Sequence, residues 1–145
     1  MSVTAMEEDV LIRLVDSWVE EDIVHLYRAG RWWKEEYNPR SINDLIRGSF
    51  AFAVAIDRMS GHAIGMGRII SDGVSDGYLQ DLVILPEFRH RSIGRKIVTA
   101  LLEKCQDAGI SWIGLIAEPD TEIFYKPLGF RRMEGHIPLI LSGDP

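Results

Sequence analysis

A strand that leads through a basic turn into a long amphipathic helix constrains this chain more than any other feature. Residues 78–85 (YLQDLVIL) are rich in strand formers, and Pro86 ends the strand because proline has no N–H to donate to a sheet. From residue 91 the apolar spacing changes to the helical period, and one face is formed by Ile93, Ile97, Leu101, Cys105 and Ala108. A chain with this unit combines strands and helices.

The rest of the chain alternates short strands and helices in the same way. Ser17 and Glu20 suit a capping box at the start of the first helix, and Gly61 suits the turn of a hairpin. We expect helices over residues 19–30, 41–48 and 120–128, and strands over residues 50–56, 62–70, 112–117, 130–133 and 137–141. Because no repeat, linker or long charge block divides the sequence, we predict one α+β domain over residues 1–145, built on a mixed sheet.

Composition excludes several classes of protein. The formal net charge of −6 argues against nucleic-acid binding, which depends on neutralising phosphates. The longest apolar stretches fall far short of a membrane helix, and the acidic first residues do not fit a signal peptide, so we expect a cytoplasmic protein. Cys105 is the single cysteine, on the buried helix face, where it is expected to pack. The four histidines lack ligand spacing, so no metal site is expected.

The positive charge is concentrated in one octet, residues 89–96 (RHRSIGRK), which holds four Lys and Arg residues. An average stretch of that length would hold about one, so the octet predicts a local site for an anion. A turn that delivers a helix N-terminus presents unpaired N–H groups and the positive end of the helix dipole, and Gly94 permits close approach of a phosphate. The alternative is an ordinary helix start with solvated arginines.

Residues 84–94 (ILPEFRHRSIG) contain neither a nucleotide P-loop nor a dinucleotide fingerprint. They resemble the acetyl-CoA motif V-x-P-x-x-[QR]-x-x-G-x-[GA] of the GNAT superfamily of acyl-CoA-dependent N-acyltransferases. Ile84 stands for the valine, and Ser92 replaces the first glycine of the motif. Ser92 keeps its backbone N–H, and it would need no unusual conformation if it lies in the helical region.

A second segment, residues 124–130 (FYKPLGF), resembles the family's F-Y-x-x-x-G-F, which lies about thirty residues downstream of the first motif. The resemblance spans nearly the whole chain. It implies the GNAT fold, an α+β fold with a mixed, mostly antiparallel twisted sheet of six to seven strands flanked by about four helices. In that fold the strand before the phosphate turn splays from the next parallel strand, and the pantetheine arm fills the gap.

The resemblance also implies which residues bind the cosubstrate, acetyl-CoA. The Leu82 N–H would bond the acetyl oxygen, and residues 82–84 would pair with pantetheine as a further strand does. The remaining contacts would come from the phosphate turn. The complete expected set is Leu82, Val83, Ile84, Arg89, His90, Arg91, Ser92, Ile93, Gly94 and Arg95.

Tyr125 matches the residue that the family uses as a general acid near the cofactor sulfur. A phenol is a weaker acid than a thiol, so we expect a hydrogen bond to the leaving thiolate with late proton transfer. The alternative is an aromatic side chain that packs beside Phe124 and Phe130, with its hydroxyl bonded locally.

Asp81 is the candidate general base, because it interrupts an apolar strand one residue before the expected carbonyl-polarising amide. The alternative is a strand-edge carboxylate that bonds a backbone N–H or Arg68. Glu35, Glu36, Asp72 and Asp76 are competing carboxylates, and an amine that arrives neutral needs no base.

The sequence therefore predicts an N-acetyltransferase that moves the acetyl group of acetyl-CoA to a primary amine by direct attack in a ternary complex. Residues 31–37 (RWWKEEY) are a candidate acceptor site, since aromatic rings beside carboxylates suit a cationic amine; they also suit a core cap or a dimer contact. A homodimer through the C-terminal strands is a further hypothesis. The alternative function is a non-catalytic acyl-CoA-binding sensor or regulatory module.

Overall fold

The computed structural model of the chain describes residues 9–142. The chain divides into two compact units, the first ending at Leu115 and the second beginning at Ile116. The single domain expected from sequence stays a prediction.

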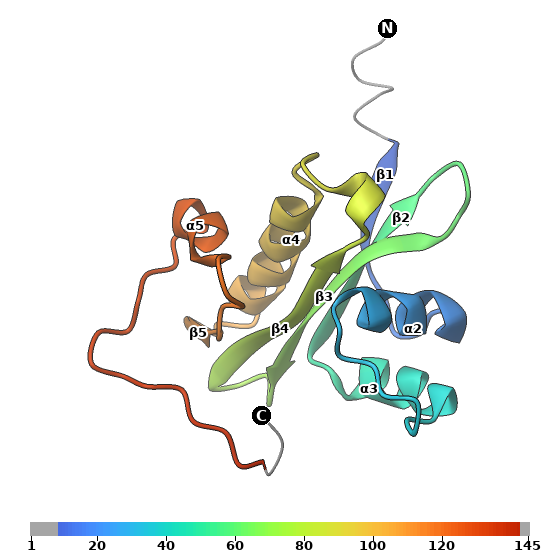
Figure 1. Cartoon of the computed structure of the whole chain (residues 1–145). Coiled ribbons are helices and arrows are strands. Elements are labelled where there is room, and N and C mark those ends of the chain that lie inside the picture. Colours follow the sequence, from blue (N-terminus) through green and yellow to red (C-terminus); the bar gives the residue numbers. More distant parts are fainter. Residues whose placement is uncertain (1–8, 143–145) are drawn as a thin grey trace, which may run out of the picture. The chain divides into compact units, whose positions relative to one another are not determined.

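The first unit is built on a five-stranded sheet in the order β1 to β5 (Figure 1). The first four strands pair antiparallel with their neighbours along the chain, and β5 lies parallel to β4. The strands are β1 (Val10–Leu14), β2 (Ala51–Asp57), β3 (Ala63–Ser71), β4 (Asp76–Ile84) and β5 (Trp112–Gly114). The α+β class, the parallel last pair and the hairpin at Gly61, with φ 77°, agree with the sequence predictions.

Three α-helices pack on this sheet. They are α2 (Glu20–Ala29), α3 (Ile42–Gly48) and α4 (Ile93–Asp107). A Cβ at Gly67 of β3 would lie 3.0 Å from Ile97 of α4, so the missing side chain lets α4 approach that face of the sheet. The next residue, Arg68, points to the opposite face, where it reaches the residues that contact α2.

The core of the first unit has two layers, one on each face of the sheet. Ile97, Leu101 and Cys105 of α4 are fully buried on one face, and Phe52 and Met66, which share the face of Arg68, are fully buried on the other. Burial also raises the pKa of the Cys105 thiol. The expectation that Cys105 packs in the core is therefore confirmed.

Asp22 fastens α2 to the start of β3. Its carboxylate accepts hydrogen bonds from the Ala63 N–H at 3.0 Å and from Trp18 Nε1 at 2.9 Å. Burial by itself would raise the pKa of Asp22, but the bonds from Ala63, Trp18 and His62 outweigh it and hold the pKa below its ordinary value. These bonds thus fix the first turn of α2 against the sheet.

The second unit contains α5 (Glu122–Tyr125), followed directly by a short 3₁₀ helix, η3 (Lys126–Leu128). Gly129 ends η3 with φ 102°, as the predicted helix end requires. The strand pair predicted at 130–133 and 137–141 was wrong, since no strand occurs between residues 116 and 142. Pro138 lacks an N–H to donate, which weakens a strand over residues 137–141.

The structure differs from the sequence predictions at three further places. The described chain has five strands where six to seven were expected, because the terminal pair is missing. The predicted buried strand at 112–117 has only three residues, and Trp112 at its start is 50% exposed. The capping box at Ser17 was also wrong: α2 begins after Val19 without a side-chain cap. None of the helices between residues 9 and 142 has the length and apolar character needed to cross a membrane.

Candidate active site

The predicted phosphate turn connects β4 to α4. Pro86–Phe88 forms a 3₁₀ helix, η2, and α4 begins at Ile93 with Ser92 as its N-cap residue. Two residues of the turn have left-handed backbones: His90 with φ 65° and Ser92 with φ 62°. The condition under which Ser92 would need no unusual conformation, a place in the helical region, is therefore not met. Ser92 retains the conformation that glycine adopts most easily, which explains why the family motif has glycine at this point.

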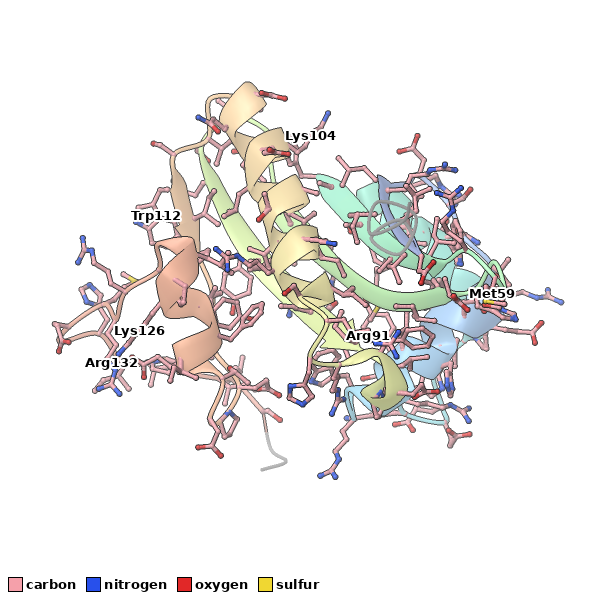
Figure 2. All side chains as sticks on the ribbon, turned by 90° about the horizontal axis from the view of Figure 1, so that it is seen from above. Met59, Arg91, Lys104, Trp112, Lys126 and Arg132 are labelled. Atoms are coloured by element: carbon pink, nitrogen blue, oxygen red, sulfur yellow. The ribbon has the colours of Figure 1, made fainter. Side chains whose placement is uncertain are left out.

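The start of α4 suits an anion. The Lys96 N–H donates to the Ser92 carbonyl at 3.1 Å, so the three N–H groups before it precede the first helical hydrogen bond. The first turn of α4 holds no acidic residue, and the Ser92 side chain makes no capping bond. The basic side chains are exposed: Arg89, Arg91, Arg95 and Lys96. In Figure 2, Arg91 extends from the turn at this end of α4.

Two of these arginines have partners inside the turn. Arg89 Nε donates to the Ile84 carbonyl at 2.9 Å, which ties the turn to the end of β4. The Arg91 guanidinium lies 5.4 Å from the centre of the Phe88 ring, a cation–π contact. These contacts of the turn hold two of its charged side chains in place. Because the Ile84 carbonyl already accepts the bond from Arg89, Ile84 can offer its N–H to a ligand more readily than its carbonyl.

The edge of β4 beside the turn is incompletely paired. β5 pairs only with residues 76–78 of β4, so within residues 9–142 the part of β4 from Leu79 to Ile84 has a strand partner on the β3 side alone. Main-chain groups on such an edge can pair with an extended ligand as with another strand. Leu82, Val83 and Ile84 lie along this stretch, as the predicted pantetheine contacts require.

A β-bulge interrupts β4 at Asp81 and Leu82. Met66 pairs with Val83 and Arg68 pairs with Gln80, so two residues of β4 lie opposite the single residue Gly67. Asp81 has φ 62°, a left-handed backbone within a strand. The bulge interrupts the regular pairing of β3 and β4 next to the Leu82 N–H. The family resemblance implies that this N–H bonds the acetyl oxygen.

The Asp81 side chain is held by two groups from other elements. Arg68 Nε donates to Asp81 Oδ2 at 2.8 Å, and the Tyr27 hydroxyl donates to the same oxygen at 2.7 Å. Burial, and then the Asp81 charge and hydrogen bond, raise the pKa of Tyr27 far above its ordinary value, so its hydroxyl remains a donor. The alternative contact with Arg68 is thus present, and the base role of Asp81 stays a prediction.

Sequence reasoning named Arg68 as a partner of Asp81 but missed Tyr27. The helical spacing placed Tyr27 on the buried face of α2, and no local pattern distinguishes a tyrosine that packs from one that also donates to a carboxylate 54 residues away.

Tyr125 lies at the end of α5 in the second unit. Its ring makes edge contacts with Phe124 at 4.9 Å and Phe130 at 5.7 Å between ring centres. Burial, with a contribution from Glu118, raises the pKa of the phenol. The packing expected by the alternative is present, and no local hydrogen bond of the hydroxyl occurs among residues 116–142. The acid role of Tyr125 stays a prediction.

The candidate acceptor segment, residues 31–37, follows α2. Trp32 makes an edge contact with Tyr27 at 6.3 Å between ring centres. A Cβ at Gly30 would lie 2.5 Å from the Trp32 ring, so that ring needs glycine beneath it. Trp33 packs against Tyr37 at 5.4 Å. Trp32 therefore packs on the end of α2, as the core-cap alternative expected, and through Tyr27 it adjoins Asp81.

Two of the four competing carboxylates, Asp72 and Glu35, have other local contacts. Asp72 accepts the Val74 and Ser75 N–H groups of its own turn, and these bonds, the one from Ser75 first, lower its pKa. Glu35 pairs with Arg28 at 3.3 Å on the surface. Between residues 9 and 142, His, Cys, Asp and Glu side chains form no group of three or more suited to a metal ion.

Comparison with known proteins adds independent findings. The model of the acetyltransferase (GNAT) family matches residues 12–130. An uncharacterised N-acetyltransferase of Pyropia yezoensis is 39% identical over 67 residues, which is 46% of this chain and 38% of that protein. The chain thus spans about two fifths of the length of that relative.

Two solved structures share the fold. A probable acetyltransferase of methicillin-resistant Staphylococcus aureus has a TM-score of 0.78 at 18% identity, covering 92% of this chain and 98% of its own. AAC(6′)-Iy, solved with the bisubstrate analogue CoA-S-monomethyl-acetylneamine, has a TM-score of 0.70 at 19% identity, covering 92% and 98%.

The matched residues include β4, its bulge, the basic turn and the second motif through Phe130. Acetyl-CoA-dependent N-acetylation is general for the acetyltransferase (GNAT) family. With the family model covering most of the sequence, the chain belongs to the acetyltransferase (GNAT) family.

Proposed function

We propose that the protein is an N-acetyltransferase that transfers the acetyl group of acetyl-CoA to a primary amine by direct attack in a ternary complex. The observation that carries the proposal is the junction of β4 and α4, where an unpaired strand edge leads into a basic turn at a helix N-terminus. One part suits the pantetheine arm and the other the diphosphate, in the order in which they occur in coenzyme A.

The diphosphate would be bound by the free N–H groups of Ile93, Gly94 and Arg95 and by the exposed side chains of the turn. Arg91 and Arg95 would neutralise part of its charge. Ser92 and His90 contribute through their backbones, because their left-handed conformations shape the turn. This fit needs no metal ion, and the lack of a metal requirement stays a prediction.

The chemistry needs three groups. The amine nitrogen attacks the acetyl carbonyl carbon while the Leu82 N–H bonds the carbonyl oxygen and stabilises its developing charge. Asp81, directly or through water, accepts the proton that the ammonium loses. The C–S bond breaks, and the departing thiolate accepts a hydrogen bond and then a proton from Tyr125.

The acceptor class rests on the family and on one neighbour. AAC(6′)-Iy was solved with an analogue that joins coenzyme A to acetylneamine, which suits an amine acceptor here too. Trp32 of residues 31–37 contacts Tyr27, which bonds Asp81, and this supports a cationic amine on this side of the sheet. The cytoplasmic location and the homodimer are likewise proposals.

A thermal shift with acetyl-CoA, followed by a thiol-release assay across a panel of primary amines, tests the proposal. Acetyl-CoA at about a hundred times its Kd should stabilise the protein by about 2.7 kcal/mol. Release of coenzyme A that depends on the amine supports an enzyme. Binding with no turnover across the panel would favour the sensor or regulatory module instead.

Tyr125→Phe tests the acid. We expect kcat to fall about 10²-fold, with little change in the KM for acetyl-CoA, because the phenol acts on the leaving thiolate and not on the bound diphosphate. Tyr78→Phe, at the other end of β4, removes a phenol hydroxyl elsewhere and serves as the matched control. Equal turnover of the Tyr125→Phe variant and the wild type would remove Tyr125 from the mechanism.

A further inference from the structure

We propose that Tyr27 and Arg68 are positioning residues of the acetyl-transfer site: they clamp Oδ2 of Asp81 and thereby hold the β4 bulge that aims the Leu82 N–H. The inference deepens the proposed function and rests on it for the catalytic part. Its structural part, the hold on the bulge, stands on the contacts alone.

The first step is the backbone of Asp81. A left-handed conformation at a residue other than glycine costs on the order of 1–2 kcal/mol, so it persists only where surrounding contacts hold it. The residue lies within β4 between residues that pair with β3, where a regular ladder would otherwise be favoured. Tertiary contacts must therefore stabilise the left-handed backbone of Asp81 and the bulge at this residue.

The second step is the pair of contacts that hold it. Both hydrogen bonds to the Asp81 carboxylate within residues 9–142 go to Oδ2, one from Arg68 at 2.8 Å and one from Tyr27 at 2.7 Å. The Arg68 and Asp81 side chains are only 16% and 12% exposed. Solvent screens a pair so placed only weakly, and neither partner finds a replacement in water if the other is removed.

The third step is the origin of the two donors. Arg68 comes from β3, the strand that Asp81 faces across the bulge, and Tyr27 comes from α2. Helix α2 is itself fixed to β3 through Asp22 and the Ala63 N–H at 3.0 Å. The Asp81 side chain is thus tied to the neighbouring strand and to the helix above it, and α2 cannot shift without disturbing the bulge.

The consequence is a fixed direction for two groups. With Oδ2 clamped, Oδ1 is the carboxylate oxygen left for an incoming amine. The next residue, Leu82, points its side chain toward α4, where Leu82 Cδ1 would lie 3.3 Å from a Cβ at Gly67. Its N–H direction follows from the bulge, so the clamp controls both the oxygen that accepts a proton and the amide that polarises the acetyl group.

The decisive experiment uses Tyr27→Phe and Arg68→Met in the full chain, with the exposed Arg13→Met of β1 as the matched control. We expect each clamp variant to lower kcat about tenfold or more, with the KM for acetyl-CoA changed less than about threefold, because the phosphate turn is untouched. Arg68→Lys, which keeps a charge, should recover part of kcat. A purely structural role would lower stability without changing kcat of the folded fraction.

The second readout needs no activity. We expect the backbone amide resonance of Leu82 in a ¹H–¹⁵N spectrum to move in both clamp variants and to stay in place in Arg13→Met. Unmoved Leu82 resonances together with wild-type kcat in both clamp variants would overturn the proposal. If the wild type shows no turnover with any amine, the proposed function fails, while the Leu82 resonance still decides whether the clamp holds the bulge.

Discussion

The bulge in β4 and the turn before α4 use the same backbone conformation in opposite ways. Asp81 and Ser92 both have φ 62° without being glycine. Asp81 is held by two side chains in a nearly buried position, whereas Ser92 makes no side-chain cap bond and lies in an exposed turn. The comparison teaches that the side chain matters at the first site, while at the second the main chain alone does.

This difference follows from where each residue lies. Within the sheet, a carboxylate removed from water needs partners, and the partners then fix the backbone. At the exposed turn, the helix start and the bond from Arg89 to the Ile84 carbonyl set the backbone conformation. A ligand can therefore use the N–H groups of the turn without competing for its side-chain contacts.

The largest expected effect is on stability, and it compares an arginine beside the bulge, Arg68, with one in the turn, Arg91. Arg68→Met should destabilise the protein by about 2–4 kcal/mol, because it leaves the Asp81 carboxylate nearly buried with Tyr27 as its remaining partner. Arg91→Met in the exposed turn should change stability by less than about 0.5 kcal/mol. Urea denaturation of both variants measures the contrast. Similar losses in the two variants would contradict the proposed division of roles.

A smaller effect compares glycine at the two left-handed positions. Asp81→Gly should lower stability by about 2 kcal/mol, because relief of the backbone does not offset the loss of the bonds to Arg68 and Tyr27. Ser92→Gly should raise stability by about 0.5 kcal/mol, the strain relieved less the extra entropy of glycine in the unfolded chain.

Thermal denaturation of the two glycine variants gives the sign of each change. The control is Ser75→Gly, in a surface turn where serine bonds Asp72. A Ser92→Gly variant that is less stable than the wild type would mean that the Ser92 side chain contributes to the turn after all.

The smallest effect is the response to salt. Raising the salt concentration from roughly 0.05 M to 0.5 M should increase the KM for acetyl-CoA about threefold, because the turn's charges are exposed and screened. The free energy of unfolding should change little over the same range, since the Arg68–Asp81 pair is largely buried. Steady-state kinetics and urea denaturation at both concentrations measure the two responses. A salt-independent KM would argue against the turn as the diphosphate site.

Local patterns predicted most of the first unit. The 3.6 period of residues 93–108 produced α4, and the hairpin at Gly61 followed from alternating strand formers around a turn. Patterns failed where tertiary context decides. The apolar residues 137–141 suggested a strand, yet no strand forms in that segment, because a strand needs a partner that its own sequence does not specify.

The candidate site divides along the same line. The basic turn and the family motifs are contiguous in sequence, so residues 84–94 and 124–130 were recognisable without a structure. The clamp on Asp81 joins α2, β3 and β4, and residue spacing gives no measure of such contacts. The left-handed conformation of Ser92 was also missed, because glycine is typical of positions with a positive φ and serine is not.

The sequence by itself determined the strand–turn–helix unit, its positive charge and the family, because each depends on residues close together along the chain. The tertiary structure alone decided that Tyr27 and Arg68 meet at Asp81. It also decided that β4 bulges there and that, within residues 9–142, β4 has no strand partner on its β5 side beyond Tyr78. The physical reason is that a hydrogen bond acts over about 3 Å of space whatever the separation in sequence, so only the folded chain brings its two partners within reach.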